Sequence, residues 1–223
     1  MLGSRLVTWF ALVTSGEFGF EREVVEKVIV DHVPLPEYRD LTSTQREEVR
    51  ALYTDLSAGL CSWDAVDDWV AELYGLSERD LQVISDTLEF NLPFSTNRRE
   101  AERPPSTDEQ SLFCDILLGE LRPWTDRFGT SVQVRAVSQP ATSPWQALEI
   151  SVGDDHEESS IGWEGLLQVA DHAAATEILL RQTSGLRIGR LAQRRYWSVT
   201  QARLLAQRIG WSHLDLLQGR VEG

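Results

Sequence analysis

Lysine and cysteine are nearly absent from this chain of 223 residues. Lys27 is the single lysine among 21 basic residues, and the two cysteines are Cys61 and Cys114. The cysteines show no CxxC spacing and have no histidine pair nearby, so the sequence indicates neither a zinc site nor a disulfide framework. We therefore expect reduced thiols, as in a cytoplasmic protein.

Long apolar runs and the common catalytic strings are also missing. No window approaches the roughly 18 to 20 uninterrupted apolar residues that a membrane-spanning helix needs, so we expect no membrane partner. The phosphate-binding strings GxGxxG and GxxxxGKS/T and the nucleophile elbow GxSxG do not occur, and the four histidines form no HxH or HExxH cluster. We expect no catalytic residue, no metal and no cofactor in this chain, which makes a free-standing enzyme the least favoured interpretation.

Acidic residues are absent from one stretch of an otherwise acidic chain. The net charge is −14, yet the stretch from Ile178 to Leu214 contains no Asp or Glu and seven arginines, which leaves −21 for the rest. The seven are Arg181, Arg187, Arg190, Arg194, Arg195, Arg203 and Arg208. This pattern predicts either a surface that attracts polyanions or a segment that pairs with acidic residues of the same chain. Charge alone favours neither of these two interpretations over the other.

The hydrophobic patterns predict an α+β protein that is mostly helical. Residues 1–94 are expected to be a helical region, residues 95–107 a linker, and residues 108–223 a smaller α+β domain with a β-hairpin or short sheet and an Arg-rich end. Helices of the first region are predicted over residues 2–14, 44–56, 62–75 and 77–88, followed by turn or linker signals. The second of them is expected to start at a capping box of Thr44 and Glu47.

The second region mixes strand and helix signals. A helix over residues 112–121 is expected to end near Pro123, because proline interrupts helical hydrogen bonding. Residues 131–138 and 145–152 alternate like the two strands of a hairpin. Further elements are predicted as a helix around 163–175, extended pieces at 178–180 and 186–188, and a last helix capped by Ser198.

Three strings resemble parts of a known family, the N-6 adenine DNA methylases of restriction and phage-defence systems. Residues 2–36 run from an apolar helix through Thr-Ser, an aromatic-Gly turn and Glu-Arg to a Leu-Pro-Leu-Pro-like end, which resembles the end of the target-recognition region of that family. Residues 67–88 are similar to the helix pair that follows there, and residues 193–206 look like a C-terminal segment of some large members. The string from Asn91 to Phe94 looks like the catalytic Asn-Pro-Pro-aromatic motif, but Leu92 replaces its first proline.

The resemblance implies a part in DNA methylation without catalysis by this chain. The catalytic domain of the family is expected to lie upstream of residue 1, either in a split gene or in a missing part of the same protein. S-adenosylmethionine is therefore expected in a partner and not here. The implied partners are DNA and a DNA methyltransferase or another subunit of a defence system.

The first functional hypothesis is a DNA-recognition or specificity component. Arginine side chains of the acid-free stretch would bind phosphates, two neighbouring aromatic residues would stack or wedge on a base, and arginines of the linker would add a second contact. The residues predicted for these roles are Arg187, Arg190, Arg194, Arg195, Tyr196, Trp197, Arg98, Arg99 and Arg103. For Tyr196 and Trp197, packing in the core is the alternative and the commoner role of such aromatic residues.

The second hypothesis is a protein-interaction subunit that docks on a partner enzyme. The segments from Asp64 to Glu89 carry eight acids against the single Arg79, and such a face would repel DNA. The apolar helix that begins at residue 2 needs a packing partner from later in the chain or from another polypeptide. Its predicted partner-binding residues are Leu6, Trp9, Phe10 and Val13.

Overall fold

The computed structural model describes residues 2–14, 31–91, 97–137, 143–153, 165, 169, 170, 172 and 175–219. The chain divides into two compact units, Met1–Thr96 (unit 1) and Asn97–Gly223 (unit 2), and each is described by itself. The described residues form eight α-helices and one four-stranded sheet, so the predicted α+β, mostly helical fold class is confirmed.

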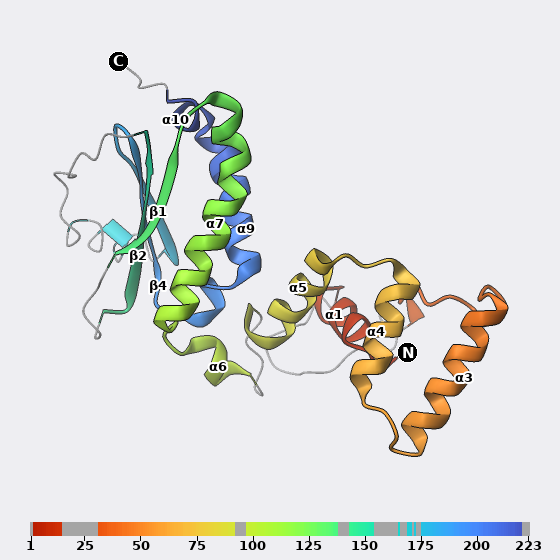
Figure 1. The fold of residues 1–223 in the computed structure, drawn as a ribbon. Helices are drawn as coiled ribbons and strands as arrows, with labels where there is room; N and C mark the ends of the chain where they lie inside the picture. The colour runs from red at the N-terminus through yellow and green to blue at the C-terminus, as the bar shows by residue number, and fades with distance from the viewer. Residues whose placement is uncertain are drawn as a thin grey trace. The chain divides into compact units, whose positions relative to one another are not determined.

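Unit 1 is helical in its described part (Figure 1). Local signals set the ends of two helices: Ser62 accepts the Asp64 N–H at one start, and Ser77 with Asp80 forms a capping box at the next. Gly75 ends the first of these in the left-handed conformation, with φ 61°, which glycine adopts without strain. The elements are α1 (Arg5–Thr14), α3 (Ser43–Ser57), α4 (Trp63–Tyr74), α5 (Glu78–Asp86) and the π-helix η1 (Thr87–Asn91).

Helix α3 starts earlier than the sequence pattern predicts. Its capping box joins Thr42 and Gln45, in which the Thr42 hydroxyl accepts the Gln45 N–H at 3.2 Å and the Gln45 side chain accepts the Thr42 N–H at 2.9 Å. The predicted box of Thr44 and Glu47 is therefore wrong, because both residues already lie inside the helix. Two hydroxyl residues compete as caps here, and the earlier one is the cap.

The core of unit 1 is small and involves α1. Leu41, Val66, Trp69 and Val70 form its buried cluster, and Leu6 of α1 packs against it. Helix α1 also contacts α4, α5 and η1. The packing partner that α1 needs therefore comes from the same unit. Within residues 2–36, which resemble the methylase segment, residues 15–30 lie outside the described residues.

Unit 2 is a two-layer structure of helices on a sheet. The sheet order is β1-β2-β4-β3, and every neighbouring pair is antiparallel. The predicted hairpin of β1 and β2 is confirmed. A second hairpin, β3 and β4, joins the first through β4, so that β2 and β4 form the centre of the sheet. The strands are β1 (Val132–Val137), β2 (Trp145–Val152), β3 (Glu177–Arg181) and β4 (Gly185–Leu191).

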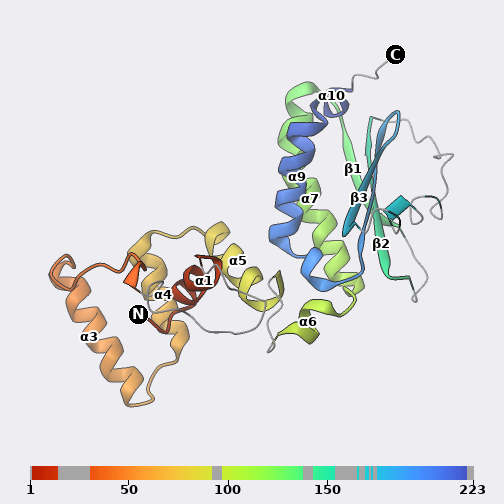
Figure 2. The same ribbon diagram turned by 180° about the vertical axis from the view of Figure 1, so that it is seen from behind.

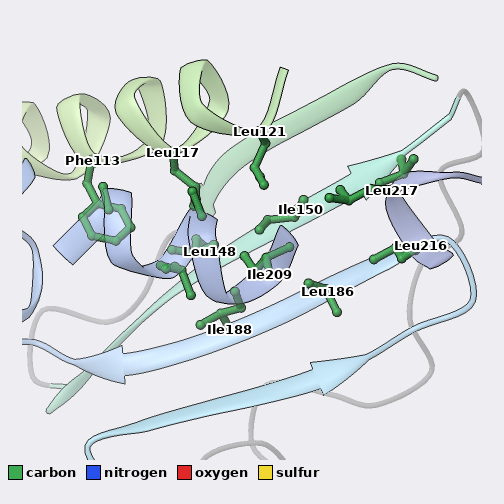
Figure 3. Close-up of a cluster of buried hydrophobic side chains, with 14 of the residues drawn as sticks. Phe113, Leu117, Leu121, Leu148, Ile150, Leu186, Ile188, Ile209, Leu216 and Leu217 are labelled. Carbon is green, nitrogen blue, oxygen red and sulfur yellow. The ribbon is translucent and has the colours of Figure 1, made fainter. Parts of the chain in front are cut away.

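Two long helices cover one face of this sheet. Helices α7 (Thr107–Phe128) and α9 (Val199–Ser212) lie side by side against it, as Figures 1 and 2 show from opposite sides. Phe113, Leu117 and Leu121 recur every four residues on α7, which places them on one face of the helix. Figure 3 shows them with the apolar side chains of β2, β4, α9 and α10 (Leu214–Leu217).

Two expectations for unit 2 differ from the structure. Pro123 lies inside α7 and does not end it, because the buried Leu121 and Thr125 anchor the helix on both sides of the proline. Part of the predicted linker is folded as α6 (Arg98–Glu102), whose Ala101 is 0% exposed. Tertiary burial, which a local pattern does not report, accounts for both differences. The predicted helix around 163–175 lies largely outside the described residues.

Candidate binding surfaces

The arginines of the acid-free stretch are mostly engaged inside unit 2. Six of the seven form ion pairs with Asp or Glu side chains of the same unit. The pairs are Arg181 with Asp215, Arg187 with Glu149, Arg190 and Arg208 with Glu177, Arg194 with Glu109, and Arg203 with Glu120. The sequence predicted either a surface for polyanions or pairing with acidic residues of the same chain. These six side chains follow the second prediction.

Arg190 is the most deeply buried of them, with a side chain that is 5% exposed. Its strand places it opposite Glu177 of β3, and their charged atoms are 2.8 Å apart. Its Nη2 donates to Gln201 Oε1 at 3.1 Å, and its guanidinium lies over the Phe113 ring at 5.2 Å. Burial lowers the pKa of Arg190 to about 10, against the opposing effect of Glu177. These contacts make Arg190 a core residue with no open face for a phosphate.

Arg187 belongs to a cross-strand row on the other face of the sheet. Glu149 of β2 lies opposite Arg135 on β1 and Arg187 on β4, and both guanidinium groups bind its carboxylate. Burial raises the pKa of Glu149, but hydrogen bonds from Arg135 and Arg187 outweigh it and hold the pKa below its ordinary value. Arg187 is 16% exposed, whereas Arg135 is 75% exposed.

Glu109 joins two predicted DNA contacts that are far apart in the sequence. Arg103 Nη1 and Nη2 donate to its two carboxylate oxygens at 2.8 and 2.6 Å, and Arg194 Nε lies 2.6 Å from the same group. The Arg103 hydrogen bonds, then the Ser106 N–H and the charge of Arg194, lower the pKa of Glu109 to about 2 despite its burial. The backbone N–H of Arg194 also donates to Arg103 O at 2.8 Å. The predicted pair of arginines is thus brought together, but around a carboxylate.

The two aromatic residues of the stretch have different surroundings. Trp197 is 1% exposed, its Nε1 donates to Leu191 O at 3.0 Å, and its ring centre lies 5.0 Å from that of Phe113. It belongs to the hydrophobic core, so a base has no access to its ring. Tyr196 is only partly buried and packs against the same core.

Two of the predicted arginines are exposed, and a third is partly buried without an ion pair among the described residues. Arg99 is exposed, and Arg98 is 69% exposed although it pairs with Glu102 at 3.0 Å. Arg195 lies 4.8 Å from the centre of the Tyr196 ring and donates to Gln193 at 2.9 Å. Helix α6, which carries the first two, contacts the 3-10 helix η2 (Arg194–Tyr196), so the linker arginines and the RRY string lie on one part of unit 2.

The predicted partner-binding helix is largely covered within unit 1. Leu6, Trp9 and Phe10 are partly buried, and the exposed residue of the predicted set is Val13, at 44%. The α1 face therefore serves unit 1 itself, and Val13 alone of the predicted residues is exposed enough to contact a partner there.

A groove between α1, α4 and α5 of unit 1 was not predicted from the sequence. Its volume is about 230 Å³, and apolar side chains and three aspartates of α4 line it. Asp64 and Asp68 are exposed, one helical turn apart, while Asp67 accepts the Arg5 backbone N–H at 2.7 Å. The acidic string DDWV, residues 67–70, is visible in the sequence. The residues of α5 that line the opposite side of the groove are brought there only by the fold. The apolar lining consists of Leu6, Ala71, Leu76, Leu81 and Ile84.

Charge is divided unequally between the two units. Unit 1 contains 18 acidic and 7 basic residues, for a net charge of −11, and unit 2 contains 17 and 14, for a net charge of −3. Most of the negative charge of the chain therefore belongs to the unit that has the groove.

Compared with known proteins, the chain matches no family model, no curated protein and no solved structure. The resemblance to N-6 adenine DNA methylases therefore stays a prediction. Across the described residues, no three His, Cys, Asp or Glu side chains are grouped to hold a metal ion. The described helices include none long and apolar enough to cross a membrane.

Proposed function

We propose that this chain is a non-catalytic interaction subunit that docks on a cationic partner protein through the acidic helices of unit 1. The groove of unit 1 carries the proposal, since Asp64 and Asp68 face solvent beside apolar side chains. The net charge of −11 attracts basic surfaces within a Debye length, about 8 Å at physiological ionic strength. The pairing of six arginines inside unit 2 removes much of the charge on which DNA binding would depend.

The resemblance of residues 2–36 and 67–88 to N-6 adenine DNA methylases supports a methyltransferase as the partner. In that case the pair acts in the cytoplasm in restriction or phage defence, and S-adenosylmethionine binds to the partner. This chain would then contribute assembly or specificity.

Co-expression with the products of neighbouring genes tests the proposal. We expect one complex that survives size-exclusion chromatography in about 0.1 M salt and dissociates in about 1 M salt, where the Debye length falls to about 3 Å. If the chain elutes alone beside every candidate at low salt, the proposed function is wrong.

A DNA-recognition component remains the second candidate, favoured by the exposure of Arg99 and by Arg195, which is in no ion pair among the described residues. The double substitution Arg99→Ala with Arg195→Ala is expected to reduce DNA affinity. It should also reduce the slope of log affinity against log salt by about 0.9 for each phosphate that the variant no longer binds. Fluorescence anisotropy with duplex DNA measures both quantities. Lack of binding by the unsubstituted chain at low salt would exclude this candidate.

A further inference from the structure

The groove of unit 1 combines a buried apolar floor with exposed carboxylates at its rim. Ala71 and Ile84 are 8% and 5% exposed, and Leu81 beside them is 41% exposed. Asp68 is exposed, and its carboxylate has no hydrogen bond or ion pair among the described residues. Asp64, one turn away, accepts a hydrogen bond from Ser62 at 3.0 Å.

One guanidinium of the chain itself, that of Arg5, also lines the groove. Arg5 Nη2 donates to Glu89 at 2.7 Å and to Ser85 at 3.2 Å, and its backbone N–H binds Asp67. Arg5 thereby forms its ion pair with Glu89, and the described residues show none between Arg5 and Asp68. The free negative charge of the groove is concentrated where Asp64 and Asp68 lie.

The size of the groove limits what can occupy it. A volume of about 230 Å³ is below the roughly 300 to 1,000 Å³ of sites that enclose whole small molecules, so one long side chain is the matching occupant. A long cationic side chain lays its methylene groups on apolar surface and keeps its charged end at the polar rim. Arginine suits this rim better than lysine because its planar guanidinium binds carboxylates with two parallel hydrogen bonds.

We infer that the groove binds one arginine side chain from a partner protein, with its methylene groups on Leu81 and Ile84 and its guanidinium at Asp68 and Asp64. This inference rests on the proposed function, because it names the chemistry by which unit 1 recognises a cationic partner. The segments 15–30 and 154–164 of the same chain are net acidic, so charge complementarity favours another polypeptide.

The test is a titration of the full chain with N-acetyl-L-arginine amide as the probe. Its binding is monitored in ¹⁵N-¹H correlation spectra of the chain. We expect saturable shifts concentrated at residues 64–71 and 81–85. N-acetyl-L-citrulline amide, which has the same shape without the charge, is expected to bind at least about fivefold more weakly. Shifts spread evenly over the acidic helices, or equal binding of the two probes, would overturn the inference.

Matched variants separate the groove from general acidity. Asp68→Asn is expected to weaken arginine binding about fivefold, and Asp40→Asn, at an exposed position outside the groove, to leave it unchanged. Leu81→Gln removes apolar contact at a partly exposed position and is expected to weaken binding without loss of the folded spectrum. Equal effects of Asp68→Asn and Asp40→Asn would show that the groove is not the site.

The two proposals fail in different ways. If the complex with the partner forms but Asp68→Asn leaves both it and arginine binding unchanged, the groove inference is wrong and the proposed function stands. If the probe binds as expected but the chain forms no complex with any neighbouring gene product, the proposed function is wrong and the arginine site stands.

Discussion

Single carboxylates in unit 2 serve more than one arginine. Glu177 binds Arg208 on α9 and the nearly buried Arg190 on β4, and Glu109 binds Arg103 and Arg194. Removing Glu177 takes the carboxylate from both Arg190 and Arg208, and removing Glu109 takes it from Arg194 while Arg103 keeps Glu100. The stability of unit 2 should therefore be more sensitive to loss of an acid than to loss of an arginine.

The pair of Arg190 and Glu177 tests this asymmetry. Glu177→Gln leaves the charge of Arg190 uncompensated in the core and is expected to reduce the free energy of unfolding by about 3 to 5 kcal/mol. The double variant Glu177→Gln with Arg190→Met removes the buried charge and should recover most of this loss. Urea unfolding of the two variants measures the difference; equal losses would show that the buried charge is not the cause.

Glu109 predicts a pH dependence of stability. Its pKa is lowered to about 2 in the folded chain from the ordinary 4.5, so its contribution is complete above pH 4.5 and is lost as the pH falls from there toward 2. Unfolding free energies of the unsubstituted chain and of Glu109→Gln should therefore differ by a few kcal/mol at pH 6 and converge toward pH 2. A difference that stays constant over this range would contradict the assignment.

At the scale of the elements, the centre of the sheet requires a residue without a side chain. At Gly185, where β4 begins opposite β2, an added Cβ would lie 2.3 Å from the Ile150 carbonyl oxygen. The contact is with backbone, so it cannot be relieved by a change of rotamer. The pairing of β2 with β4 depends on this close approach.

Gly185→Ala is expected to lower the free energy of unfolding by about 1 to 3 kcal/mol, the range of an overpacked core. Gly119→Ala in α7 provides a control with the opposite sign. An added Cβ there meets nothing within 4 Å, so replacing a helical glycine should stabilise by about 0.5 to 1 kcal/mol. Denaturant midpoints give both values; stabilisation by Gly185→Ala would mean that the strands can separate without cost.

Elements with local signals could be predicted from the sequence. Ser62, Gly75 and Ser77 mark helix ends by hydrogen bonds or conformations that involve only their neighbours, and the β1–β2 hairpin joins adjacent strands. The helix end predicted at Pro123 is wrong because the burial that holds α7 together comes from other elements. The pairing of β2 with β4 likewise joins distant segments and left no local pattern.

The candidate sites were predictable to a smaller extent. The sequence located the concentration of arginines but not their partners, since Glu109 reaches Arg194 only through the fold. It also identified the acidic segments, whereas the groove needed the packing of α1 and α5 beside α4. A sequence shows which residues are charged. Whether a charged side chain is neutralised by an opposite charge depends on its distance to residues that are remote in the sequence.

For the whole molecule, the two units should differ in stability. The main buried cluster of unit 1 contains four residues and that of unit 2 fifteen, counted over the described part of the chain. Calorimetry of the full chain is expected to show two transitions, with unit 2 unfolding at the higher temperature because it buries more apolar surface.

A fragment of residues 97–223 provides the control. It should keep the higher transition within a few degrees, since its core contains no residue of unit 1. An unfolded fragment, or a single transition of the full chain that the fragment does not reproduce, would show that the units do not fold independently.

The strand order of unit 2 sets the order of its completion during synthesis. The ribosome releases the N-terminal segments first, so α7, β1 and β2 emerge before β4 and α9 can cover them. Until then residues 97–177 carry 15 acidic and six basic residues, a net charge of −9, and this like charge keeps the nascent intermediates apart. The arginines arrive together with the strand and helix that close the core. The acid-free stretch therefore cancels the protective charge at the moment when the apolar surface no longer needs protection.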